Sequence, residues 1–215
     1  MAISKANFNS FNVTPTASKF ITFNSSNNGL AADDVGGSLV LISTQTASSS
    51  ANLSFTSGID STYKEYIFKF INIHPASDTV NFQINASVDG GSNYNVTKTT
   101  TFFLAYHTED DSATALQYYA NRDLAQSTAA QQIVTIGNAN DDSGSGTLHL
   151  FDPSNTTFVK NFTSRIVAPT GEDTENCKDT YAAGYFNTTS AIDAIQFSMS
   201  SGNIDSGVIK MYGVT

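Results

Sequence analysis

The sequence predicts an all-β protein, an antiparallel, jelly-roll-like β-sandwich preceded by an extended N-terminal arm. Three observations support this prediction. About ten or eleven short segments alternate apolar with polar residues, clusters of Gly, Ser, Thr, Asn and Asp separate them, and helical periodicity is nearly absent. Short strands at such regular spacing indicate a sandwich or barrel rather than strand–helix–strand units.

Residues 1–35 form the predicted arm, and residues 36–215 form the predicted sandwich domain. Within the arm, Phe8, Phe11, Phe20 and Phe23 are scattered among Asn and Ser without a regular period. Because exposed aromatic rings are costly in water, we expect the arm to pack on its own domain or on a neighbouring subunit. A loosely ordered terminus is the alternative.

The strongest predicted strand is Tyr66–Ile73. Its alternation places Tyr66, Phe68, Phe70 and Asn72 on one face and Ile67, Lys69, Ile71 and Ile73 on the other. The predicted strands, in order, are Ser38–Ser43, Asn52–Phe55, Tyr66–Ile73, Val80–Val88, Val96–His107, Ile133–Ile136, Thr147–Phe151, Phe158–Val167, Tyr181–Phe186, Ile192–Met199 and Val208–Tyr212.

Two intervening segments carry their own signals. Asp89–Asn93 predicts a turn, because its Asp, Gly and Asn residues tolerate positive φ angles. Residues 113–126 favour either the one helix of the domain or an irregular excursion. Near the C-terminus, Gly202 and Gly207 are expected to frame a hairpin turn between the last two strands, with Ile209, Met211 and Tyr212 closing the core.

The polar surface consists of hydroxyl and amide groups rather than ions. The 215 residues carry a net charge of -9, only 13% are charged and 11% are aromatic, while Ser, Thr and Asn make up roughly a third of the chain. This composition excludes a charged disordered tail protein. It also disfavours nucleic acid as a partner, because Arg122, Lys160 and Arg165 are too far apart in the sequence to indicate a basic face.

A single cysteine, Cys177, lies in a charged and polar stretch and is expected to be exposed. A secreted domain of this kind commonly carries paired cysteines. The N-terminus lacks the apolar segment of a signal peptide, and no apolar run approaches the length of about 20 residues that spans a bilayer. We therefore expect a soluble protein, made in the cytoplasm, with no membrane partner.

The residues that could carry chemistry form no recognisable catalytic pattern. His74, His107 and His149 fall in different strands, so only a composite metal site could unite them. Acidic pairs and triplets lie between strands, at Asp33–Asp34, Glu109–Asp111 and Asp141–Asp142. The predicted strands contain almost no Asp or Glu in their cores, and Asp193, beside the start of a strand, is the chief exception. No catalytic residue, cofactor or metal ligand set is expected, and the protein is predicted not to be an enzyme.

Two binding possibilities stay open. Asn138–Gly144 resembles a calcium loop in its alternating oxygen ligands, but His149 stands where an EF-hand would need an acidic residue, so a solvated turn is the default. Tyr94, Tyr118 and Tyr119 could stack on sugar rings, although packing at the edge of the sandwich is the simpler role for them.

Three blocks carry a resemblance to a known group. They are Tyr66–Pro75 with Asp89–Tyr94, Ser145–Pro153, and Phe197–Val214, which contains the run SGNIDSGVIKMYGV. In this order they resemble virion structural or tail-fibre-like proteins of tailed bacteriophages, marine ones above all, whose chains end in SGNI-x-SG-x-I-x-(hydrophobic)-YG. The resemblance covers roughly residues 36–215.

This resemblance implies a place on the phage particle and no catalytic residues. The implied protein is a non-enzymatic structural component, as head decoration or as a tail or fibre subunit. It would be made in the host cytoplasm and assembled with other capsid or tail proteins, as a homo-oligomer such as a trimer. The Phe-bearing arm would anchor it to neighbouring subunits. The alternative is a carbohydrate-binding adhesin that recognises a host surface glycan.

Overall fold

The computed structural model describes residues 19–23, 30–34, 38–172 and 174–215, which fall into two compact units, residues 1–38 and 39–215. In the first unit, β1 (Lys19–Phe23) and β2 (Leu30–Asp34) form an antiparallel pair. The predicted arm otherwise lies outside the described residues, as do Phe8 and Phe11, whereas Phe20 and Phe23 belong to β1.

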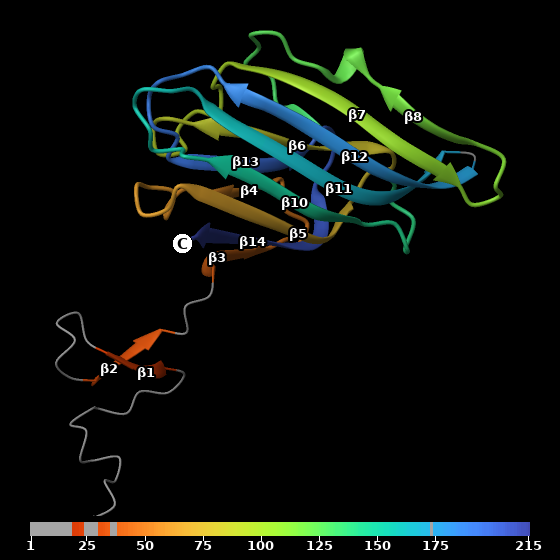
Figure 1. Ribbon diagram of the computed structural model, residues 1–215. Helices are drawn as coiled ribbons and strands as arrows, with labels where there is room; N and C mark the ends of the chain where they lie inside the picture. The colour runs from red at the N-terminus through yellow and green to blue at the C-terminus, as the bar shows by residue number, and fades with distance from the viewer. Residues whose placement is uncertain (1–18, 24–29, 35–37, 173) are drawn as a thin grey trace, which may run out of the picture. The chain divides into compact units, whose positions relative to one another are not determined.

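The second unit consists of two antiparallel sheets packed against each other, as the sequence predicted (Figure 1). The larger sheet has the order β3-β14-β5-β10-β11-β12-β7-β8 and the smaller has the order β4-β13-β6-β9. The strands are β3 (Leu39–Thr46), β4 (Asn52–Phe55), β5 (Glu65–Pro75), β6 (Val80–Ser87), β7 (Lys98–Thr108), β8 (Thr114–Tyr118), β9 (Gln131–Ile136), β10 (Gly144–Phe151), β11 (Lys160–Glu172), β12 (Thr174–Phe186), β13 (Ala194–Met199) and β14 (Ile204–Val214).

A cluster of five phenylalanines joins the two sheets. Phe68 and Phe70 come from the larger sheet, and Phe55, Phe82 and Phe197 come from the smaller one. Phe197 is fully buried, and its ring centroid lies 5.1 Å from that of Phe70 and 5.4 Å from that of Phe68. Edge-to-face packing at such distances adds to the hydrophobic gain of burial. The alternation that predicted Phe68 and Phe70 on one face is confirmed.

A β-bulge reverses the alternation at the end of β5. Asn72, predicted to share a face with Phe68 and Phe70, has a φ of 50° and is exposed although those two rings are buried, whereas Ile73, predicted on the other face, is 1% exposed. The pairing register shifts opposite this point in both neighbouring strands, β10 and β14. An extra residue in one strand sends the following side chains to the opposite face, which is why simple alternation is wrong here.

Gly207 belongs to this bulge, not to a turn between the last two strands. It lies within β14 with a φ of 120°, and a Cβ there would come within 2.6 Å of the Asn72 carbonyl oxygen. Strands β13 and β14 also lie in different sheets, so the predicted C-terminal hairpin is wrong. Gly202 does lie in the connection, also with a positive φ, and Ile209 and Met211 are buried as expected.

Residues 113–126 contain a strand and one short 3-10 turn instead of an α-helix. Strand β8 pairs with β7 at the edge of the larger sheet, and the 3-10 turn η2 covers Ala120–Arg122. The apolar residues of this segment fitted a helical face only loosely. Pairing with β7 satisfies the backbone hydrogen-bonding groups along one edge of β8, and the Leu116 side chain stays 73% exposed.

The turn predicted at Asp89–Asn93 is confirmed. The Asp89 carboxylate accepts hydrogen bonds from the Asn93 side chain and main chain and from the Ser87 hydroxyl. These bonds, with that of the Asn93 side chain the strongest, lower the pKa of Asp89 to about 2. Asp193 braces the same turn from the start of β13, because its carboxylate accepts a bond from the Gly90 N–H.

Replacing Phe197 with alanine should destabilise the domain by about 3–5 kcal/mol, because the ring lies at the centre of the inter-sheet cluster and its removal leaves a cavity. Urea unfolding followed by circular dichroism measures the loss. Phe158→Ala is the matched control, since Phe158 is 69% exposed. Equal stability of the two variants would show that the sheets do not depend on this cluster.

Candidate functional site

The outward face of the larger sheet carries a hollow of about 380 Å³ over three neighbouring strands. Thr99–Thr101 of β7, Asn161 of β11 and Ala183–Tyr185 of β12 line it. These strands lie side by side, with β12 in the middle (Figure 1). The lining consists of hydroxyl, amide, methyl and phenol groups, and no charged side chain contributes to it. Its volume falls within the range of small-ligand sites.

Strand register explains the hollow. Thr101, Ala183 and Thr163 stand opposite one another on β7, β12 and β11, so three small side chains form a row across the strands. The next outward row on one side holds Thr99, Tyr185 and Asn161, and the row on the other side holds Phe103, Tyr181 and Arg165. Thr101 and Ala183 of the small row line the hollow together with Thr99, Tyr185 and Asn161 of the first flanking row, and the hollow forms a groove beside the second flanking row.

The second of these flanking rows is a continuous stack. The rings of Phe103 and Tyr181 are parallel, with centroids 4.8 Å apart and an interplanar angle of 3°. The Arg165 guanidinium covers the Tyr181 ring at 5.2 Å and is held by the Asp179 carboxylate at 2.7 Å. Because Arg165 and Asp179 neutralise each other, this row beside the groove carries no net charge.

Gln126 fixes the opposite wall. Its side-chain amide donates to Thr99 Oγ1 at 2.7 Å and to the Tyr185 hydroxyl at 3.5 Å, and its main-chain N–H donates to the same Thr99 oxygen at 3.2 Å. Asn187 Nδ2 donates to Gln126 Oε1 at 2.5 Å. The φ of Gln126 is 48°, a conformation that non-glycine residues rarely adopt and that surrounding contacts must maintain.

A second, smaller hollow of about 230 Å³ lies at the Asn138–Gly144 loop, for which calcium binding was the alternative to a solvated turn. Asn72, His74, Ser206 and the loop residues Asn140–Ser143 line it. Asp142 is 4% exposed, and burial raises the pKa of its carboxyl, with the nearby Asp141 and Asp78 charges acting in the same direction. No set of three or more His, Cys, Asp or Glu side chains in the described parts of the chain is arranged to hold a metal ion.

The structure does not bring the three histidines together. His74 Nε2 lies 3.2 Å from the Ala139 carbonyl oxygen, His107 Nε2 lies 2.9 Å from Asp111, and His149 Nδ1 lies 2.5 Å from Glu65. Each histidine thus has its own local partner. Of the acidic groups, Glu109–Asp111 forms the turn between β7 and β8, and Asp33–Asp34 belongs to β2.

The tyrosines singled out in the sequence have three different environments. Tyr94 has a buried hydroxyl without a hydrogen-bond partner, and Tyr119 packs against the core beside Phe102. Only Tyr118 is a surface residue, 62% exposed, with its hydroxyl bonded to Asp123. Tyr212, expected in the core, instead faces outward beneath the Lys69 ammonium group, 5.1 Å from the ring centroid.

Arg122, Lys160 and Arg165, the basic residues considered in the sequence, have separate local partners. Arg165 is paired with Asp179, and the Arg122 guanidinium lies over Phe102 and Tyr119 at 5.1 and 5.0 Å. Lys160 is buried and donates to the carbonyl oxygens of Phe158 and Thr188. Cys177, as predicted, is free and exposed, but it lies within β12 rather than in a loop.

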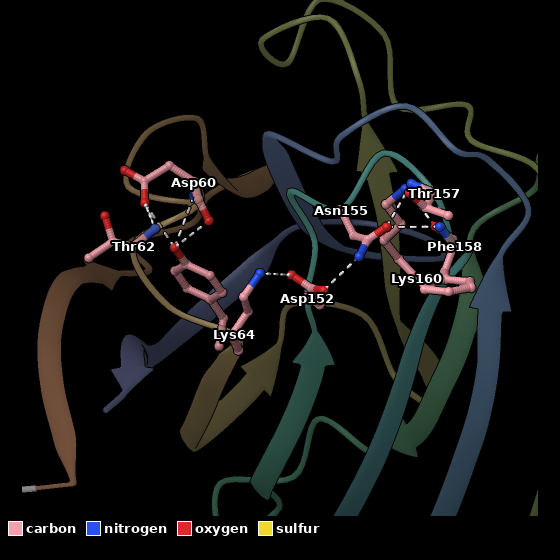
Figure 2. Close-up of polar contacts among 9 residues, drawn as sticks. Asp60, Thr62, Lys64, Asp152, Asn155, Thr157, Phe158 and Lys160 are labelled. Atoms are coloured by element: carbon pink, nitrogen blue, oxygen red, sulfur yellow. Dashed lines mark hydrogen bonds and ion pairs between the residues drawn. The ribbon is translucent and has the colours of Figure 1, made fainter.

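A polar cluster near Lys160 braces the loops at one end of the sandwich (Figure 2). The Asp152 carboxylate accepts bonds from Asn155 Nδ2 at 2.8 Å and from Lys64 Nζ at 2.9 Å, and these contacts lower its pKa. The Tyr66 hydroxyl accepts a hydrogen bond from the main-chain N–H of Asp60 and donates one to the Asp60 carbonyl oxygen, which ties the Asp60 loop to β5. These bonds are internal, so the cluster stabilises loops and leaves no open site.

No family model, curated protein or solved structure matches this chain. No helix in the described part of the chain is long and apolar enough to cross a membrane.

Sequence reasoning missed the residues of the groove. Thr99, Thr101, Asn161, Ala183 and Tyr185 occupy outward positions of three predicted strands, so alternation alone indicates that they are at the surface. Their proximity depends on strand order, since β7 lies next to β12 although β7 ends at Thr108 and β12 begins only at Thr174. A Tyr-x-Ala-x-Tyr pattern at Tyr181–Tyr185 is the one local signal of a gap between two rings.

The buried Lys98 ammonium gives a testable pH dependence. Its Nζ donates to the Ala129 carbonyl oxygen at 2.6 Å, it lies 5.9 Å from the Phe186 ring, and burial lowers its pKa to about 8. Between about pH 8 and 10.5 the unfolded state binds more protons than the folded state. The free energy of unfolding should therefore rise with pH in this window, by up to about 3 kcal/mol.

Denaturant unfolding of the wild type and Lys98→Met at pH 7.5 and 10 measures this effect, because only the wild type should gain from the deprotonation of Lys98. Lys64→Met is the control, since Lys64 is an exposed lysine with a side-chain exposure of 76%. An unchanged difference between wild type and Lys98→Met at the two pH values would contradict the prediction.

Proposed function

We propose that this protein is a non-enzymatic structural subunit of a bacteriophage particle, built on a β-sandwich and assembled with copies of itself and with other virion proteins. The three sequence blocks that resemble phage structural proteins support a location of this protein on the phage particle. The conclusion that it assembles depends on one observation, the exposed apolar edge of the larger sheet.

That edge is β3. Leu39, Val40 and Leu41 are consecutive and are 37%, 39% and 52% exposed. One side of the β3 backbone pairs with β14, and no strand of the larger sheet among the described residues lies on the other side. Proteins that remain monomeric protect such edges with charge, proline or a covering segment, because an exposed apolar edge strand pairs readily with another chain. Here the edge carries none of those charges at Leu39–Leu41.

The full chain should therefore sediment as a homo-oligomer at micromolar concentration, and Leu39→Lys/Leu41→Lys should shift it to a monomer, because two charges on the edge oppose strand pairing. Sedimentation velocity measures both. Leu116→Lys is the matched control on the opposite edge strand, β8. A wild type that is monomeric throughout would contradict assembly through β3.

A separate experiment tests whether the protein is located on the phage particle. Immunogold labelling of purified virions with an antibody against residues 39–215 should decorate the particle surface. Absence of label, with the protein recovered only from the soluble lysate, would contradict the virion proposal.

A second function, recognition of a host surface glycan, is favoured by the neutral groove on the outward face. Its hydroxyl, amide and aromatic lining matches the chemistry by which proteins bind sugars. A glycan array probed with and without a chelator separates this function from a purely structural role, because a structural subunit leaves the array unlabelled.

A further inference from the structure

We infer that the groove across β7, β12 and β11 is a binding site for a short neutral oligosaccharide, with the sugar chain lying across the strands over Thr101, Ala183 and Thr163. This inference rests on the second proposed function, glycan recognition, and locates it. It does not depend on the structural role in the particle.

The shape of the groove favours an elongated ligand. Thr101 and Ala183 line its floor, and Thr163 of β11 continues the same cross-strand row beyond the hollow. Neighbouring strands lie about 4.8 Å apart, so this row spans about 10 Å, long enough for more than one pyranose ring. Tyr185 stands on one side and the Phe103–Tyr181 stack on the other, which restricts the ligand to the direction of the row.

Free polar groups lie where a sugar would need them. The side chains of Asn161 and Thr163 form no hydrogen bond with another residue in the described parts of the chain, and both are exposed. An amide both donates and accepts, as a hydroxyl does, so Asn161 and Thr163 can pair with sugar hydroxyls acting in either direction. The Ala183 methyl group and the Tyr185 ring supply the apolar surface that the carbon–hydrogen face of a sugar requires.

The site is preorganised, which reduces the entropic cost of binding. Gln126 holds Thr99 and Tyr185 by hydrogen bonds, and Asn187 in turn holds Gln126. The Arg165–Asp179 pair and the aromatic stack fix the other wall. Walls held in this way lose little side-chain freedom when a ligand binds.

Charge selects a neutral ligand that does not need calcium. The lining contains no charged side chain, and the Arg165 and Asp179 side chains near the adjoining row are paired with each other. The acidic loop at Asp141–Asp142 precedes the first residue of β10, whereas the groove row meets β10 at His149, toward its other end. Binding should therefore be unaffected by a chelator.

The test titrates the full-length chain with maltotetraose, cellotetraose, mannotetraose and chitotetraose, with sialyllactose as an acidic comparison. Binding is followed by isothermal titration calorimetry and by amide chemical shifts. We expect at least one neutral sugar to bind in the presence of a chelator and to shift the amide signals of Thr99, Thr101, Asn161 and Thr163.

Variants then locate the sugar. Ala183→Leu fills the groove floor and Asn161→Ala removes the free amide, and each should weaken binding about tenfold or more, equivalent to 1.4 kcal/mol. Phe158→Ala, an exposed aromatic outside the groove, should bind as the wild type does. Because Asn161 is an exposed residue on the sheet surface, its truncation should leave the thermal unfolding temperature unchanged.

Three results would overturn the inference. If a neutral sugar binds the wild type and both groove variants equally, the glycan function stands but its site lies elsewhere. If only sialyllactose binds, or binding requires calcium, the neutral groove is not the site. If no sugar binds at millimolar concentration, both the glycan function and its location in this groove fail, and the structural role in the particle stays unaffected.

Discussion

The packing of two sheets of unequal width around one aromatic cluster is the constraint on which this structure depends. Phe197 of the four-stranded sheet contacts Phe68 and Phe70 of the eight-stranded sheet, and all three rings are buried. Four strands contribute fewer core side chains than eight, so bulky aromatic rings fill the centre of the interface between the two sheets. The buried Lys98 and Lys160 lie in register with Phe186 and bind loop carbonyl groups, which ties the loops at this end to the core.

The unequal width also determines which surfaces are available for function. An eight-stranded sheet presents a broad outward face and two edges, and neutral side chains line the hollow in that face over β7, β11 and β12. The low charge of the chain has a physical meaning here, because a face of hydroxyl, amide and aromatic groups interacts through hydrogen bonds and stacking rather than through long-range fields. The apolar edge at β3 and the groove over β12 are separate features of this sheet, so assembly and sugar binding do not exclude each other.

The positions of the strands could be predicted well from the sequence, whereas the pairing of the strands within the sheets could not. All eleven predicted strands of the sandwich domain are present, because apolar alternation is a local property that each strand carries in its own residues. Alternation failed at Asn72 and Ile73, where a bulge opposite Gly207 reverses the faces. Tyr212 was expected in the core, but it follows the buried Met211 and faces outward, as alternation requires. The weak helical pattern of residues 113–126 yielded to pairing with β7, since tertiary contacts override marginal local preference.

The sequence by itself determined the architecture: short strands with hydroxylated outer faces, amide-rich turns, an exposed Cys177 and an inter-sheet core of Phe residues. The tertiary structure alone decided which strands are neighbours. Strand order places Thr101, Ala183 and Thr163 in one row and exposes Leu39–Leu41 at an edge, and neither result is encoded within any single segment. The physical reason is that side-chain periodicity is local, whereas sheet order is decided by contacts between residues far apart in the chain.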